Sequence, residues 1–179
     1  HKQGFSYQGE LVEYPEEGRA DRVGAGAGLG YNVNIPLGED CGDDDYYAAF
    51  VHLVLPLIDQ YTPDFIVIAA GFDASIYDHS RPQGGYRVST NCYERLLHAV
   101  LLRVPQGRAV CTLEGGYDAH GLAVNVEASL QVLGKFDYKT AQHAAFPMQE
   151  QQVAVETVAA VQAVKDTFRE HNCDLWWGG

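Results

Sequence analysis

Two apolar segments of this sequence end in residues that can do chemistry. The segment FIVIAAG is followed, after one phenylalanine, by Asp73, and the segment RAVCTLEGG is followed by Tyr117. A carboxylate at a strand end can bind a metal ion or exchange a proton, and a tyrosine hydroxyl can donate a hydrogen bond to a developing oxyanion. Gly115 and Gly116 allow a substrate to approach the backbone closely. We therefore expect Tyr117 to lie over the same rim as Asp73, where the rim is the edge formed by the ends of the two strands.

Each of these residues also has a simpler interpretation. An aspartate after a strand is more often a turn or cap residue than a functional one, and Tyr117 is one of 11 tyrosines. Asp78 lies in the following loop, where hydrogen bonding within the loop is its simplest role. His79 and His120 lie near the two rims and can contact a ligand there. The sequence GAGAGLG (24–30) follows a charged segment and opens a β-like one, so we interpret it as a turn and not as a dinucleotide-binding loop.

Alternating strands and helices are expected to position this chemistry. Strands are predicted at 31–37, 65–71 and 108–116, and helices at 46–58, after the capping candidates 89–91, at 122–133 and at roughly 149–170. Uninterrupted apolar strands are typical of a parallel sheet that is buried on both faces. The order of elements predicts an α/β domain with right-handed crossovers, and ligands bind beyond the carboxyl ends of such strands.

Composition narrows the class of protein. The 179 residues are 46% hydrophobic and 20% charged, as in an ordinary globular domain. The net charge of −12 argues against direct nucleic-acid binding, and no apolar run is long enough to span a membrane. The cysteines, at 41, 92, 111 and 173, show no metal-binding spacing. We expect them to be reduced in an intracellular protein, cytoplasmic or, in a eukaryote, also nuclear.

Taken together, the segments resemble the histone deacetylase and acetylpolyamine amidohydrolase family, particularly its class II-like members. The match begins near Tyr14-Pro15, runs through GAGAGLGYNVNIPL, GDDDYYAAF, IVIAAGFDAS and CTLEGGYD, and ends near Leu133. This family has an arginase-like α/β fold with a parallel sheet flanked by helices. The resemblance implies a zinc-dependent hydrolase of linear amides, which removes acetyl or related acyl groups from lysine or polyamine-type amines.

The resemblance also implies which residues would act on the substrate. Tyr117 would polarise the substrate carbonyl and stabilise the oxyanion. The wall of the acyl tunnel would include Gly115 and Gly116, and Tyr14 matches an aromatic position that lines it. The loop after Asp73 is longer than the Asp-Pro-Leu-Gly-Gly usual in the family, and Gln83 stands where the family has leucine.

Two metal sites follow from the resemblance as well. Asp73 would be the second of two aspartate ligands of the catalytic Zn²⁺, and Tyr31 matches a position at a structural K⁺ site in some members. In the family an Asp-x-His pair supplies the other two zinc ligands and a His-His pair supplies the general base. Neither motif occurs before Asp73 in this sequence. We therefore expect a complementary N-terminal segment or chain to complete the site.

We interpret residues 1–179 as the C-terminal part of one deacetylase-like catalytic domain. A loop-rich region with one strand is expected at 1–42, an alternating helix and strand core at 43–134, and a C-terminal helical segment at 135–179. Such an incomplete domain would expose an unpaired strand edge and apolar surface. Two alternatives remain open: a non-catalytic fragment or interaction module of the same fold, and another α/β enzyme with a metal-free Asp/Tyr pair.

Overall fold

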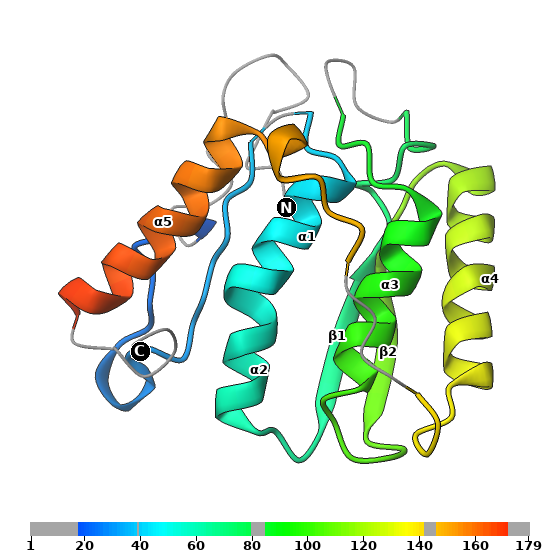
Figure 1. The fold of residues 1–179 in the computed structure, drawn as a ribbon, viewed down its shortest axis with the longest axis horizontal. Helices are drawn as coiled ribbons and strands as arrows, with labels where there is room; N and C mark the ends of the chain where they lie inside the picture. Colours follow the sequence, from blue (N-terminus) through cyan, green and yellow to red (C-terminus); the bar gives the residue numbers. More distant parts are fainter. Residues whose placement is uncertain (1–17, 39, 80–84, 142–145, 172–179) are drawn as a thin grey trace.

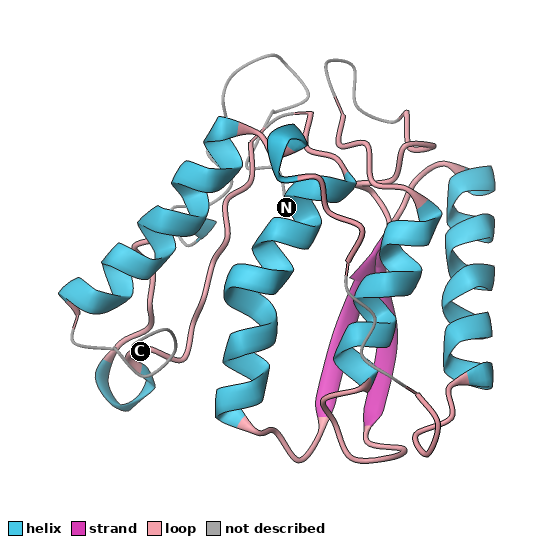
Figure 2. Cartoon of the chain, viewed as in Figure 1, coloured by secondary structure: helices cyan, strands magenta, loops and turns pink. Residues whose placement is uncertain are grey.

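A computed structural model describes residues 18–38, 40–79, 85–141 and 146–171. The helices and strands, in chain order, are α1 (Asp43–Ala49), α2 (Leu55–Tyr61), β1 (Ile66–Gly71), α3 (Thr90–Leu101), β2 (Ala109–Gly115), α4 (Ala119–Lys135) and α5 (Val155–Glu170). Figure 1 shows α3 in front of the two strands, with α1 and α2 to one side and α4 to the other. Both apolar segments form strands, as predicted, and Figure 2 shows them as the adjacent magenta arrows.

The helix predicted at 46–58 is present and is longer than expected. A π-helical segment, Phe50–Val54, joins α1 to α2 without a break. It ends two residues before Pro56, whose ring does not fit against the carbonyl four residues earlier in a regular α-helix. The helix ends where Thr62 adopts a left-handed conformation, with φ of 47°, and Pro63 follows.

β1 and β2 form a parallel pair with one irregularity at its end. The register shifts after Ala70, so that Gly71 lies opposite Gly115 and Glu114 is left over as a bulge in β2. The Phe72 N–H then donates to the Gly115 carbonyl at 3.0 Å. This bond fixes the register of the two strand ends. From these ends the chain continues to Asp73 and to Tyr117.

One face of the strand pair is apolar and open to solvent. Phe65, Val67 and, on β2, Val110 are 52%, 64% and 45% exposed, whereas the alternate side chains of β1 are partly buried. Within the described residues the sheet contains two strands, so each strand has an unpaired edge. The structure therefore shows the open edges and apolar surface expected of an incomplete domain.

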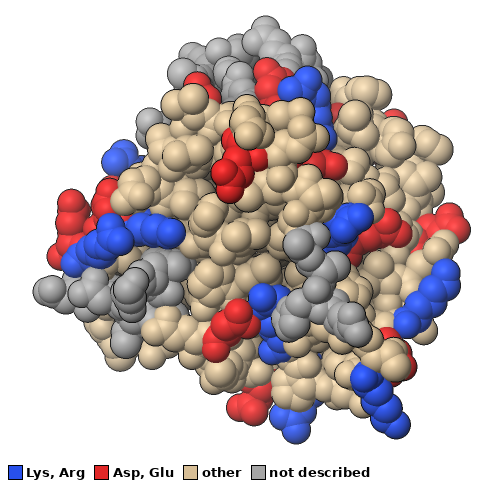
Figure 3. Space-filling model, in the orientation of Figure 1, with Lys and Arg blue, Asp and Glu red and all other residues tan. Residues whose placement is uncertain are grey.

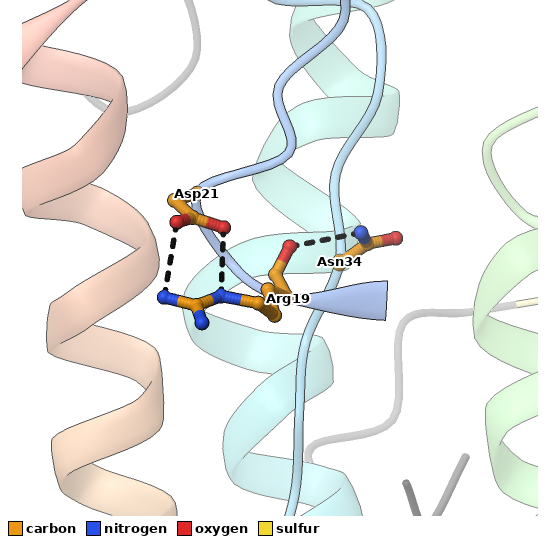
Figure 4. Close-up of polar contacts among 3 residues, drawn as sticks. All are labelled: Arg19, Asp21 and Asn34. Carbon is orange, nitrogen blue, oxygen red and sulfur yellow. Dashed lines mark hydrogen bonds and ion pairs between the residues drawn. The ribbon is translucent and has the colours of Figure 1, made fainter. Parts of the chain in front are cut away.

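The strand predicted at 31–37 does not form. The Asn34 side chain donates to the Arg19 carbonyl at 2.9 Å, beside the ion pair that Arg19 makes with Asp21 (Figure 4). The Asn32 side chain bonds to the backbone of the same turn. Side-chain to backbone hydrogen bonds thus hold this extended segment, where a strand would need a neighbouring strand.

The alternation of apolar and polar residues in 31–37 nevertheless has a structural cause. Val33 and Ile35 pack against an apolar cluster made of Val23, Leu53, Val161, Val164 and Phe168. Three of these residues belong to α5, which begins at Val155, later than the predicted 149. Val155 and Val158 are exposed, and α5 packs on the cluster with the side that carries Val161, Val164 and Phe168.

Neither sign of charge dominates the face of the molecule seen in Figure 3. Figure 3 shows acidic and basic side chains interspersed on one face of the molecule, with uncharged residues between them. Among the described helices, none combines the length and the apolar character that crossing a membrane would require.

The acidic start of α1 ties three parts of the chain together. Asp43 accepts hydrogen bonds from the Ser89 N–H at 2.7 Å and from the Ser89 hydroxyl at 2.6 Å. Ser89 is the N-cap of α3, as predicted, because its hydroxyl oxygen accepts from the Cys92 N–H. The neighbouring aspartates bond instead to the segment that leads into α5.

We predict that Asp45→Ala destabilises the fold more than Asp44→Ala. The buried Asp45 carboxylate accepts from the N–H groups of Gly42 and Ala154, both at 2.9 Å. Each hydrogen bond to a charged group contributes about 1.5–3 kcal/mol to the free energy of unfolding. Asp44 accepts one exposed bond, from Gln149, and is the matched control. Urea denaturation measures both variants, and equal losses of stability would contradict the prediction.

Candidate functional site

The structure brings Asp73 and Tyr117 together around Gly115. A Cβ atom built on Gly115 would lie 3.7 Å from Cγ of Asp73 and 3.8 Å from the hydroxyl oxygen of Tyr117. The carboxyl and the hydroxyl therefore border one small space, which is open because Gly115 has no side chain. Asp73 is half-buried, and the Tyr117 side chain is 71% exposed. The shared rim predicted from the sequence is present.

The turn that carries Asp73 is held on both sides. Phe72 is buried and packs edge-to-face on Tyr93 of α3, with ring centroids 5.1 Å apart. On the other side, the Val88 N–H donates to the Ala74 carbonyl at 3.1 Å. These contacts anchor the residues immediately before and after Asp73, which gives its carboxylate a defined direction.

Gly115 and Gly116 are glycines for different reasons. Gly116 has a φ of 114°, and a Cβ there would lie 3.1 Å from both Leu122 Cδ1 and Phe72 Cβ. Backbone strain and crowding therefore both favour glycine at this position. Around Gly115, by contrast, a Cβ would meet its neighbours at ordinary contact distances, so the missing side chain serves to keep the space open.

Asp78 has a partner that sequence reasoning missed. It is 8% exposed, and its Oδ2 accepts a hydrogen bond from the Tyr117 backbone N–H at 2.7 Å. The expectation of hydrogen bonding within its own loop was incomplete, because this bond crosses from one rim to the other. No local pattern could have revealed it, since the two residues are 39 positions apart.

Neutral tyrosines surround the base of the site. Burial, and next the charge of Asp73, raises the pKa of the Tyr93 hydroxyl above its usual range. Burial together with the neighbouring Tyr93 raises the pKa of Tyr46 in the same way. A tyrosine hydroxyl is already protonated at neutral pH, and the raised pKa keeps these two hydroxyls neutral at more alkaline pH as well.

The described residues do not form a complete metal site. They contain no group of three or more His, Cys, Asp or Glu side chains placed to hold a metal. His79 and His120 are exposed, and the His120 ring packs on Tyr77 at 5.4 Å. Because catalytic zinc usually takes three protein ligands, Asp73 fits such a site only together with donors from elsewhere.

The remaining predicted positions contribute little to this geometry. Tyr31 is exposed, and its ring packs edge-to-face on Tyr61 at 6.3 Å. Tyr14 lies outside the described residues. The segment GAGAGLG forms a short 3-10 turn, Gly26–Gly28, between loops, and is followed by an extended segment, not by the helix of a dinucleotide-binding motif.

Comparison with known proteins identifies the family. Residues 5–133 match the family described as Histone deacetylase domain. The chain belongs to the histone deacetylase family. It is 40% identical over 127 residues to human Polyamine deacetylase HDAC10, covering 70% of this chain and 18% of the relative. It is 36% identical over 166 residues to Histone deacetylase 5 of Arabidopsis thaliana, covering 91% of this chain and 23% of the relative.

Solved structures of histone deacetylases have the same fold. The HDA15 HD domain superposes with a TM-score of 0.71 at 31% identity, covering 90% of this chain and 41% of that chain. Histone deacetylase Clr3 gives a TM-score of 0.75 at 26% identity, covering 93% of this chain and 26% of that chain. The predicted arginase/deacetylase-like fold is confirmed, and this chain spans less than half the length of each of these relatives.

We predict that alanine affects the two glycines in opposite ways. Gly116→Ala should lower the free energy of unfolding by about 1–3 kcal/mol, because alanine is strained at positive φ. Gly115→Ala should leave stability nearly unchanged, but its methyl group would fill the space between Asp73 and Tyr117 and lower the activity of the full-length protein. Thermal unfolding and turnover of both variants check this, and a Gly115→Ala variant with full activity would contradict it.

Proposed function

We propose that this chain is the part of a zinc-dependent deacylase that carries Asp73 and Tyr117. The enzyme would remove acetyl or related acyl groups from lysine or polyamine-type amines. The observation that carries the proposal is the space at Gly115, where a carboxyl and a phenol hydroxyl meet at the ends of two parallel strands. The relatives named as a polyamine deacetylase and as histone deacetylases support amide hydrolysis of this kind.

In this proposal Asp73 holds Zn²⁺ together with ligands that lie outside the described residues. Zinc supplies the Lewis acidity that polarises the acyl carbonyl and acidifies the attacking water. The turn around Asp73, anchored by Phe72 and Ala74, keeps the carboxylate in one direction and so limits the reorganisation needed on metal binding. The K⁺ site suggested for Tyr31 belongs to the same proposal and has less support, because that side chain is largely exposed.

Tyr117 would act directly on the substrate. Its hydroxyl borders the Gly115 space and can donate a hydrogen bond to the carbonyl oxygen as negative charge develops there. Its exposed ring leaves this donor accessible from solvent. Gly115 and Gly116 would let the acyl group pass close to the backbone, and Tyr14 would line the tunnel.

We predict that Tyr117→Phe in the full-length protein lowers kcat about 10²–10³-fold, the usual effect of removing one oxyanion donor. Zinc content and thermal stability should not change, because the hydroxyl is exposed at the rim. Tyr61→Phe removes another exposed tyrosine hydroxyl, on α2, and serves as the control with unchanged turnover. If Tyr117→Phe deacylated a fluorogenic acetyl-lysine peptide at the wild-type rate, the role given to Tyr117 would be wrong.

We predict that Asp73→Asn lowers the zinc content of the full-length protein, because an amide replaces the anionic ligand. Asp137→Asn removes an exposed carboxylate at the end of α4 and should keep the metal. Metal analysis of the purified proteins gives the answer. A wild-type protein that bound no zinc would instead favour a non-catalytic interaction module, the alternative supported by the absence of a three-residue metal group among the described residues.

A further inference from the structure

The Tyr117 side chain needs an anchor that packing does not provide. Its ring is 71% exposed, so few side-chain contacts restrain it. The two residues before it are glycines, and Gly116 is at positive φ, where no side chain limits the backbone. A donor that must meet a developing oxyanion has to be held in place before the reaction, because positioning errors of about 1 Å can cost a large part of the rate.

The bond to Asp78 provides this anchor. The Tyr117 N–H donates to Asp78 Oδ2 at 2.7 Å, and a carboxylate acceptor makes this bond stronger than one between neutral groups. Asp78 is almost fully buried, where such a bond competes little with water. On the following residue, Asp118 accepts the Gly121 N–H at 2.7 Å and caps α4, which fixes the chain after Tyr117.

Asp78 is itself held by a buried polar chain. Its N–H donates to the Ser75 carbonyl at 2.9 Å. The Ser75 hydroxyl accepts from the Asn125 side chain at 2.9 Å, and the Asn125 oxygen accepts from the Thr90 hydroxyl at 2.7 Å. Asn125 on α4 and Ser75 are both fully buried. The loop after Asp73 is thereby fastened to the N-terminus of α3 and to α4.

Close backbone approach keeps this loop on α4. A Cβ built on Gly121 would lie 2.7 Å from Tyr77 Cβ, so the residue next to Asp78 rests directly on the first turn of the helix. Any larger residue at Gly121 would push the loop, and Asp78 with it, away from Tyr117. Asp78 therefore has a fixed position at the point where it receives the Tyr117 N–H.

We propose that Asp78 is a positioning residue for Tyr117. It acts through the backbone of Tyr117 and does not touch the substrate. The proposal rests on the function proposed above, because it assumes that the Tyr117 hydroxyl takes part in the reaction. It predicts that Asp78 matters for turnover only as long as that hydroxyl is present.

A double-mutant cycle in the full-length protein tests this relation. Asp78→Ala should lower kcat about 10²-fold with KM nearly unchanged, because the donor is misplaced. Asp78→Asn keeps an oxygen acceptor and should recover most of the rate. Added to Tyr117→Phe, Asp78→Ala should lower kcat less than about twofold further, since interacting residues are not additive. Multiplicative losses in the double variant would overturn the proposal.

Asp118→Ala is the matched control. It removes a carboxylate that accepts a backbone N–H at the same distance in the same rim, but the N–H belongs to Gly121. Loss of this cap should lower thermal stability, by about 0.5–2 kcal/mol in unfolding free energy, and lower kcat at least tenfold less than Asp78→Ala does. Equal losses of kcat would assign the effect to general loosening of the rim and overturn the proposal.

Hydrogen exchange gives a readout that does not depend on activity. In protein labelled with ¹⁵N-tyrosine, the Tyr117 amide should exchange faster in Asp78→Ala, and close to the wild-type rate in Asp78→Asn. Unchanged exchange in Asp78→Ala would overturn the proposal. If Asp78→Ala does not fold, the same cycle is measured with Asp78→Asn. The smaller loss of kcat expected for Asp78→Asn must then disappear when Tyr117 is already replaced by phenylalanine. A fully active Tyr117→Phe variant would refute the role proposed for Tyr117 in the reaction, and with it any effect of Asp78 on turnover through that hydroxyl. Faster exchange of the Tyr117 amide in Asp78→Ala would still show that Asp78 anchors the backbone.

Discussion

The bulge at Glu114 sets the geometry of the whole rim. Because one residue of β2 is left over, Gly71 lies opposite Gly115, and counting on from that pair places Tyr117 opposite Asp73. If the ladder continued without this shift in register, Gly71 would pair with Glu114, and Tyr117 would lie one position further on, about 3.3 Å away, with its side chain starting from the opposite face. The meeting of the carboxyl and hydroxyl at Gly115 thus depends on a single irregularity in a parallel ladder.

Hydrogen bonds between side chains and backbone hold the loops around this rim. Asp43 ties the start of α1 to the N-cap of α3, and Asp45 ties it to the residue before α5. Asn125 connects α4 to the loop after β1. Such buried polar bonds fix loop geometry more tightly than apolar contacts, because a broken one leaves a buried group unsatisfied. The described residues leave apolar side chains exposed at Val67 on β1 and Leu130 on α4, outside these polar contacts.

Features controlled by local sequence were predictable. The two strands, the helix that begins at the acidic residues 43–45 and the cap at Ser89 all follow from periodicity and from residues that satisfy free backbone groups. The alternation of apolar and polar residues at 31–37 wrongly predicted a strand. There, asparagine side chains make the hydrogen bonds that a neighbouring strand would otherwise make. Burial on the helices also does not follow hydrophobicity alone. Leu130 and Val158 point to solvent, while Asn125 and Thr157 are fully buried.

The site itself was only partly predictable, because some of its contacts join residues that are far apart in the sequence. Strand ends predicted that Asp73 and Tyr117 share a rim, and family resemblance supplied their proposed roles. Neither the bulge nor the bond from Tyr117 to Asp78 has a local signature, because both arise from pairing between segments about 40 residues apart. These two non-local features turn a shared rim into a defined site.

Asp73 and Tyr117 both have a fixed backbone, but their side chains differ in exposure to solvent. Asp73 is half-buried on an anchored turn, which suits the metal-ligand role proposed for it. Tyr117 has a ring in solvent but a backbone N–H bound to a buried carboxylate. A hydrogen-bond donor for an oxyanion must be both reachable by the substrate and oriented in advance, and these requirements conflict if the ring itself is packed. Fixing the backbone through Asp78 satisfies both, because it orients the tyrosine without covering its hydroxyl.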